Sequence, residues 1–325
     1  MKKVIIDTDP GIDDAAALLL ALASPELSIV AITTIYGNAP VEVTTQNAYK
    51  ILYSASRIDI PIYLGASKPL LRDPNTGWAL HVHGDDALGN TYLPVPDVSD
   101  IKQPHHAAIE IINRVMAKPG EITLIALGRL TNIALALSIE PKLVESVAEI
   151  IVMGGAIYVA GNVSRFATAN LHEDPESASI VYQSGVPIVQ VGLDVCNDVE
   201  IPPDQFSKIR NKPTASTQLL TAATPVLQSY YRNHNLLKSN QAVRFNDMPA
   251  VAYAINPTFF TSSQHAVAIE IHDEESRGQT RLVTSSTTPK NKCVTVCLTV
   301  DADRLTSFFS TRVSQYRVID KQGLG

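Results

Sequence analysis

The 325-residue chain is poor in cysteine, which excludes a fold built on a disulfide framework. Its three cysteines are Cys196, Cys293 and Cys297. The last two fall in one strand-like run, where they would lie on the same side about 13 Å apart, beyond the reach of a disulfide. We expect buried free thiols, and without a second Cys/His pair nearby their spacing does not indicate a zinc site.

The chain also lacks an apolar run long enough to cross a membrane. Residues 15–23 are continuously apolar, but this stretch is too short to span a bilayer. The basic start at residues 1–3 resembles the beginning of a signal peptide, but Asp7 interrupts the apolar run that follows. We therefore expect a cytoplasmic protein with no membrane partner.

Positive charge is in the minority, with 26 Lys and Arg against 32 Asp and Glu and a net charge of −6. Nucleic-acid-binding chains usually carry a basic stripe, so we expect a small-molecule ligand and no nucleic acid. No Pro-, Gly- or Ser-rich linker, internal repeat or run of charge divides the sequence. With 45% hydrophobic residues the chain can bury a substantial core, and we expect residues 1–325 to form one domain.

Short apolar runs alternate with helical patterns through the first two-thirds of the chain, which is typical of parallel β-α units. The runs cover residues 4–7, 28–34, 61–64, 122–127, 149–153 and 187–193. Their nearly continuous hydrophobicity suits strands that helices cover on both faces. In open sheets of this kind ligands bind beyond the carboxyl ends of the strands, where polar or glycine-rich positions recur in this sequence.

The last third of the chain has a different pattern. Residues 265–271, 281–286 and 292–300 are typical of short antiparallel strands, and residues 304–316 of an amphipathic helix. Residues 76–90 have no clean period and are interpreted as a long loop. The predicted fold class is α/β, with an open, mostly parallel sheet flanked by helices and a small antiparallel β extension near the C-terminus.

Four carboxylates, those of Asp7, Asp9, Asp13 and Asp14, fall within eight residues where the first apolar run turns into a helical pattern. Asp7 and Asp9 share one face of an extended segment, and the other two stand where the helix begins. Like charges about 4 Å apart repel by roughly 4 kcal/mol at an effective dielectric of about 20, so the group needs protonation or a cation. Helix capping would account for one acid, not for four. The sequence therefore predicts a site for a hard divalent cation.

This run, Asp-Thr-Asp-Pro-Gly-Ile-Asp-Asp-Ala at residues 7–15, resembles the signature of the nucleoside hydrolases, calcium-dependent N-ribohydrolases that cleave nucleosides to ribose and base. Further segments similar to this family follow in the family's order. They are residues 33–38, 126–137 (beginning Ala-Leu-Gly-Arg-Leu-Thr-Asn), 152–155, 161–162, 170, 174–178, 191–195, 246–247 and 277–280. The ordered set covers most of the chain, which is identified as a member of the inosine-uridine preferring type.

The resemblance implies hydrolysis of the N-glycosidic bond of ribonucleosides by a water molecule that a bound Ca²⁺ activates. By position, Asp9, Asp14 and Asp247 would be carboxylate ligands of the ion, and Leu127 a ligand through its backbone carbonyl. Asp9 would also be the general base that takes the proton of the attacking water. Carboxylate and carbonyl oxygens are the ligands that Ca²⁺ prefers.

The resemblance also implies a ribose pocket and a quaternary state. Asp13 would bind the ribose 2′-hydroxyl, and the rest of the pocket would be formed by Asn38, Met153, Asn162 and Asn170. Taken one at a time, each of these asparagines has an ordinary alternative, because Asn is frequent in turns after strands. Relatives are usually homodimers or homotetramers, and the same is expected of this chain.

Three positions depart from the family pattern. Thr168 stands where many relatives have the Glu two residues before the sugar-binding Asn, on the 5′ side of the ribose. Asn246 replaces the His that precedes the last acidic ligand, and an amide cannot donate a proton to the departing base as an imidazolium can. Arg129 replaces a proline. We also expect Asn246 or Asp247 to cap a short buried helix.

One loop contains the aromatic and histidine side chains expected near the nucleobase. Trp78 is expected to stack on the base, as aromatics do in purine-preferring relatives that lack the acidic His, and the alternative is an aromatic that anchors the loop. His81 and His83 are expected near the mouth of the site. Tyr230 and Tyr231 are interpreted as an aromatic rim or as core.

The sequence is also compatible with two other functions. A non-catalytic nucleoside- or ribose-binding protein of the same fold would keep the metal site without leaving-group activation, as the residues Asn246 and Thr168 suggest. A haloacid dehalogenase-type phosphatase is suggested by Asp7-x-Asp9 after a strand, but the following Pro-Gly and the second acidic pair do not fit that motif.

Overall fold

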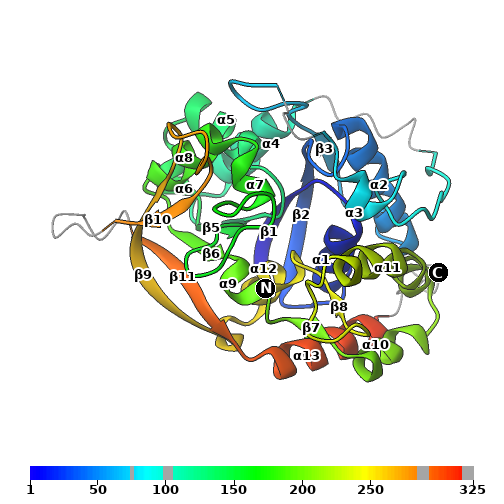
Figure 1. Ribbon diagram of the computed structural model, residues 1–325. Helices are drawn as coiled ribbons and strands as arrows, with labels where there is room; N and C mark the ends of the chain where they lie inside the picture. The colour runs from blue at the N-terminus through cyan, green and yellow to red at the C-terminus, as the bar shows by residue number, and fades with distance from the viewer. Residues whose placement is uncertain (74–76, 98–104, 284–292, 317–325) are drawn as a thin grey trace.

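The computed structural model describes residues 1–73, 77–97, 105–283 and 293–316, and a large sheet crosses its centre (Figure 1). In these ranges the sheet has nine strands in the order β10-β9-β11-β6-β5-β4-β1-β2-β3. The strands are β1 (Lys2–Thr8), β2 (Leu27–Thr34), β3 (Ile62–Leu64), β4 (Ile122–Ala126), β5 (Glu149–Met153), β6 (Ile188–Val191), β9 (Phe260–Ile269), β10 (Thr280–Leu282) and β11 (Cys293–Val300). β7 (Glu200–Ile201) and β8 (Val243–Arg244) form a separate two-stranded ribbon.

The pairing confirms the predicted fold class and corrects one detail of it. All six apolar runs of the first two-thirds form neighbouring parallel strands, from β6 to β3. β9 is antiparallel to β11 and β10 is antiparallel to β9, as expected near the C-terminus. However, β11 also pairs in parallel with β6, so it belongs to the main sheet. Of the predicted strands, residues 284–286 and 292 lie outside the described residues.

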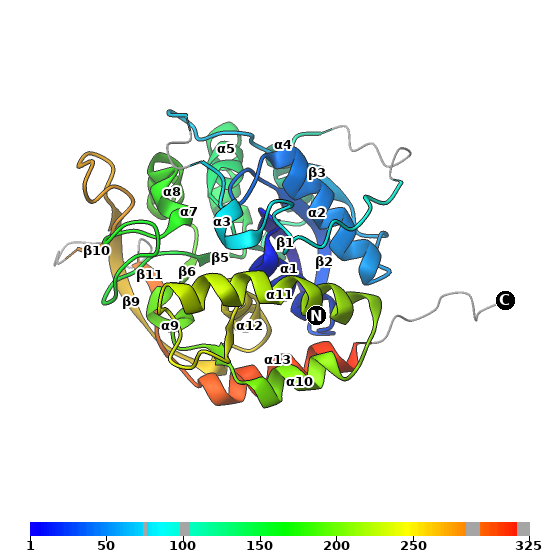
Figure 2. The ribbon, with the colours of Figure 1, turned by 45° about the vertical axis from the view of Figure 1, so that its right-hand side comes forward.

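Helices cover both faces of the sheet because strand side chains alternate between the faces. Ile5 of β1 packs into one core with α4, α5 and α8, whereas Val4 and Ile6 pack into the other with α1, α11, α12 and α13. Figure 2 shows the latter helices gathered on one side. The helices are α1 (Ile12–Leu22), α2 (Val41–Ser54), α3 (Leu80–His83), α4 (Ala107–Ala117), α5 (Thr131–Ile139), α6 (Leu143–Ser146), α7 (Ala169–His172), α8 (Pro175–Gln183), α9 (Leu193–Cys196), α10 (Pro203–Arg210), α11 (Ala215–Asn233), α12 (Met248–Ile255), α13 (Ala302–Gln315) and a 3₁₀ turn at Pro257–Phe259.

Two helices bring distant parts of the chain to the carboxyl ends of the strands. α1 begins four residues after β1 ends, and it packs against α12. The first turns of both helices therefore lie beside the ends of β1 and β4, where the sequence predicted a ligand site.

Two smaller predictions are revised by the structure. The segment at residues 76–90 contains the helical turn α3, and residue 76 lies outside the described residues. Cys196 and Cys297 are buried free thiols as expected, whereas Cys293, the first residue of β11, is half-buried. In the described residues no helix is both long and apolar enough for a membrane span.

Asp174 ties α8 to two other segments, and its removal is expected to destabilise the fold. Its carboxylate is buried, caps α8 through the Ser177 N–H (3.1 Å) and accepts from the Thr131 hydroxyl (2.6 Å) and the Leu70 N–H (3.2 Å). Asp174→Ala should lower the free energy of unfolding by about 2–4 kcal/mol, measured by urea denaturation. Asp174→Asn keeps an acceptor oxygen and should cost less. Equal costs for the two variants would contradict this account.

Candidate active site

A cavity of about 380 Å³ opens at the carboxyl ends of the strands, a volume within the usual range for small-molecule sites. Almost all of the site residues predicted from the sequence line it. They are Asp9, Asp13, Asn38, Trp78, His83, Leu127, Met153, Asn162, Thr168, Asn170, Asn246 and Asp247. Asp14 is the exception, because its side chain is fully buried and does not reach the cavity surface.

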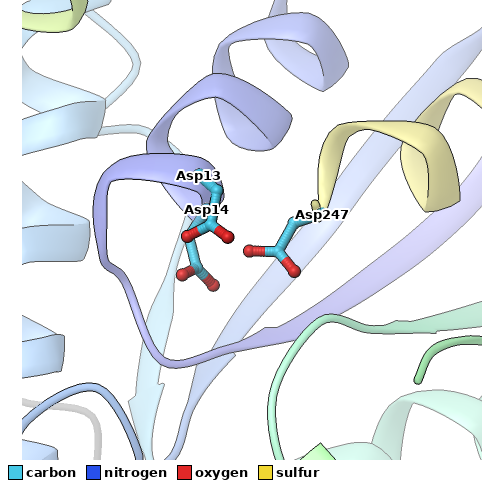
Figure 3. Close-up of side chains that lie close together, drawn as sticks. All are labelled: Asp13, Asp14 and Asp247. Atoms are coloured by element: carbon cyan, nitrogen blue, oxygen red, sulfur yellow. The ribbon is translucent and has the colours of Figure 1, made fainter. Parts of the chain in front are cut away.

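Three buried carboxylates converge at one end of this cavity. Figure 3 shows Asp13 and Asp14, from the first turn of α1, facing Asp247, which precedes the first turn of α12. One oxygen from each lies within 4.8 Å of the others. Asp247 occupies the N-cap position of α12 but makes no capping hydrogen bond, so the expectation that it caps this helix is wrong. Its carboxylate is turned towards the other acids instead.

The electrostatics of this group favour a bound cation. Burial raises the pKa of Asp13 to about 6, and burial together with the charge of Asp13 raises the pKa of Asp14. The pKa of Asp247 lies well above its usual range because of burial and the charges of Asp13 and Asp14. Asp13 Oδ1 is buried without a hydrogen-bond partner. Converging hard oxygen donors, one of them unpartnered, fit a divalent cation.

The capping interpretation holds for Asp14 in part. Its Oδ2 accepts from the Gly11 N–H (2.9 Å), which closes the first turn of α1, and its Oδ1 accepts from the Thr8 hydroxyl. The Asn38 side-chain amide also donates to Asp14 Oδ2 (3.1 Å) and to the Asp9 carbonyl oxygen (2.9 Å). Asn38 therefore holds the β1–α1 turn in place from the neighbouring strand end.

Asp9 lies outside the group of three carboxylates whose nearest oxygens are within 4.8 Å of one another. Its Oδ2 accepts from the Asn38 backbone N–H (2.9 Å) and from Arg129 Nη1 (2.6 Å). Gly37 and Gly128 approach the carboxylate so closely that a Cβ atom at either position would collide with it. Burial raises the pKa of Asp9 well above its usual range, and the charge of Arg129 opposes this shift.

The predicted ligand Leu127 and the predicted sugar residues Met153 and Asn170 are joined by hydrogen bonds. Asn170 Nδ2 donates to the backbone carbonyls of Leu127 (2.5 Å) and Met153 (3.0 Å). The amide thus links the ends of β4 and β5, and it still lines the cavity. The Leu127 carbonyl retains a second lone pair.

Thr168, Asn162 and Trp78 form the outer part of the cavity. The Thr168 hydroxyl accepts from the Gly155 N–H (3.0 Å), and the exposed Asn162 accepts from the Ala169 N–H (2.9 Å). Trp78 is half-buried and packs on the small cluster that contains Ile35. Trp78 therefore anchors its loop and also lines the cavity, so the two interpretations of this residue are compatible.

Histidine and tyrosine side chains form the wall nearest to Asn246. Asn246 Nδ2 donates to the Tyr231 hydroxyl (2.9 Å), and Tyr231 contacts Tyr230 edge-on, with ring centroids 5.7 Å apart. Tyr230 contacts His81 in the same manner, also at 5.7 Å. His83 Nδ1 accepts from the Ile12 N–H (3.2 Å), and burial lowers the pKa of His83 to about 4, so it is neutral at pH 7.

Sequence reasoning missed three charged residues of the cavity, Arg129, Glu173 and Arg244. Arg129 was noted only as a departure from the family pattern, and Glu173 and Arg244 were not noted at all. The side chains of Arg129 and Glu173 are buried, and they form an ion pair at 2.8 Å inside the cavity wall. The substitution of an arginine for a proline was the available signal, but it did not say which acids the guanidinium would meet.

A buried group of carboxylates that can hold a cation, beside a small-molecule cavity at the strand ends of a parallel sheet, defines a metal-assisted hydrolytic site. The sequence profile described as inosine-uridine preferring nucleoside hydrolase matches residues 4–307. The chain belongs to this family and is an N-glycosyl hydrolase. The phosphatase alternative is therefore set aside.

Individual relatives agree with this assignment. The chain is 36% identical to the inosine-uridine preferring nucleoside hydrolase of Leishmania major over 93% of this chain and 94% of that protein. It is 37% identical to a probable uridine nucleosidase 2 of Arabidopsis thaliana over 83% and 82%. A solved plant nucleoside hydrolase, the PpNRh1 enzyme, superposes with a TM-score of 0.89 at 36% identity, covering 97% of this chain and 99% of that one.

Proposed function

We propose that the protein hydrolyses ribonucleosides to ribose and free base, with Asp9 as the general base and Ca²⁺ as the cation. The observation that carries the proposal is the convergence of Asp9, Asp13 and Asp247 on one cavity that is also lined by Trp78, Tyr230 and Tyr231. A ribonucleoside offers matching groups, because it has hydroxyls on the sugar and a planar base.

Four groups would hold the cation. They are the carboxylates of Asp9, Asp14 and Asp247 and the backbone carbonyl of Leu127. A cation bound there would acidify water and polarise the ribose hydroxyls. The cation site is supported by the geometry of Asp13, Asp14 and Asp247, whose nearest oxygens lie within 4.8 Å of one another, and by the charges of neighbouring acids that raise the pKa of Asp247.

The remaining side chains would bind the substrate. Asp13, with an unpartnered Oδ1, would accept a hydrogen bond from the 2′-hydroxyl, and Asn162 and Thr168 would border the 5′ side. Asp9 would remove the proton from the water that attacks the anomeric carbon, while the bond to the base breaks. Asn246 cannot protonate the departing base. Stacking on Trp78 or on Tyr230 would stabilise the base instead.

The proposal is tested by a substrate panel. The purified protein is incubated with inosine, adenosine, uridine and cytidine in the presence of Ca²⁺, and reducing sugar is measured. We expect release of ribose from at least one nucleoside. Nucleoside or ribose binding in a calorimeter without release from any of them would support the non-catalytic binding protein instead.

A further inference from the structure

Arg129 places a permanent positive charge inside the group of acids that forms the proposed active site. Its side chain is 3% exposed, and it lies between two carboxylates that are themselves almost completely buried. Nη1 donates to Asp9 Oδ2 (2.6 Å), whereas Nε and Nη2 donate to Glu173 Oε2 (3.0 and 2.8 Å). Nη1 also lies 3.4 Å from Asn170 Oδ1.

The planar guanidinium explains why both carboxylates can be held at once. Its donors form a rigid fork, so fixing one edge on Glu173 also fixes the direction in which the opposite edge donates. That opposite edge meets Asp9 Oδ2, which is also the oxygen bound by the Asn38 N–H. Because both donors reach Oδ2, Oδ1 is left as the oxygen that can accept a proton.

We propose that Arg129 is a positioning residue for the hydrolytic reaction: held by Glu173, it orients the Asp9 carboxylate and assigns its Oδ1 to proton transfer. This inference rests on the proposed function of Asp9. A lysine cannot replace the arginine, because a single ammonium group cannot span Glu173 and Asp9 in a fixed plane.

The first test separates positioning from substrate binding. Arg129→Lys and Arg129→Ala should lower kcat about 100-fold with KM changed less than about threefold, since misplacing a catalytic group by about 1 Å costs roughly that factor. Arg277→Ala is the matched control. Arg277 is also a buried arginine paired with a glutamate, Glu176, but it does not line the cavity. Its loss should lower stability and leave the kcat of the folded enzyme unchanged.

The second test is chemical rescue. Arg129 lines the cavity, so small molecules can reach the space that the alanine variant leaves. Millimolar guanidinium or methylguanidinium should raise the kcat of Arg129→Ala at least about tenfold and saturably, because it restores the charged fork without the chain. Urea, which has a similar shape and no charge, should not. Calorimetry should show guanidinium binding to Arg129→Ala and not to the wild type, whether or not the assay is active.

The outcomes separate this inference from the proposed function. A wild type that hydrolyses no nucleoside overturns both. A wild type that is active, with an Arg129→Ala variant that keeps its kcat, or that loses kcat and is rescued neither by guanidinium nor by methylguanidinium, overturns the role of Arg129 alone.

Discussion

Asp9→Asn is expected to lower kcat by about 10²–10⁴-fold while the protein stays folded, the range over which a general base normally contributes. The amide has the size of the carboxylate and fits between Gly37 and Gly128, so no cavity or clash arises. It cannot accept a proton at pH 7. The loss should appear in the release of reducing sugar under saturating nucleoside and Ca²⁺.

A matched control variant distinguishes the loss of the general base from the general effect of removing a buried negative charge. Asp174→Asn removes the same charge from another buried, hydrogen-bonded aspartate that does not line the cavity. It should retain the wild-type kcat, and both variants should give similar circular dichroism spectra. An Asp9→Asn enzyme with wild-type turnover would mean that another group takes the proton.

Removal of the cation is expected to abolish hydrolysis and to destabilise the protein. Without an ion, Asp13, Asp14 and Asp247 are held within 4.8 Å of one another at their nearest oxygens, so their repulsion opposes folding. Adding Ca²⁺ at about 100 times its Kd should stabilise the metal-stripped protein by about 2.7 kcal/mol, a rise in Tm of about 5 °C. Asp247→Asn should abolish most of this rise, as measured by differential scanning calorimetry.

The same three carboxylates should make the free energy of unfolding of the metal-stripped protein depend on pH. Burial raises the pKa of Asp13 to about 6, above its value of about 4 in an unfolded chain, so the folded state binds the proton more tightly. The free energy of unfolding of the metal-stripped protein should therefore fall as the pH rises from about 4 to 6. Excess Ca²⁺ should remove this fall, because a divalent cation held by Asp14 and Asp247 beside Asp13 favours the ionised form of the Asp13 carboxylate. A fall of the same size with and without Ca²⁺ would argue against a cation at these acids.

The fold was predictable where local sequence decides it. The run at residues 149–153 became β5 with the same bounds, because its four consecutive buried apolar positions, residues 150–153, can be satisfied only between helical layers. α1 was predictable from the acids at its start and the apolar stretch after them. The pairing of β11 with β6 was not predictable, because the choice of a partner strand depends on tertiary packing. The local alternation of apolar and polar residues carries no information about that choice.

The sequence predicted which residues belong to the site better than it predicted the contacts that they make. The resemblance selected Asp9, Asn170 and Asp247, and the structure brings all three to one cavity. It did not show that Asn170 donates to the Leu127 carbonyl, since that contact depends on how two strand ends align. The ion pair between Arg129 and Asp9 could not be predicted either, because the two residues are 120 positions apart and come into contact only in the folded chain.

The close packing around Asp9 limits which residues of the cavity can be substituted. Glycine is obligatory at positions 37 and 128, because any side chain there would displace the carboxylate. Part of the remaining lining comes from residues 77–82 and 160–163, which are not in contact with Asp9. Within these segments Gly161 is restricted, because a Cβ atom there would collide with the Ala167 backbone. A redesign for a new nucleobase should therefore vary these two segments, keep Gly161, and leave the strand ends that hold the proposed general base unchanged.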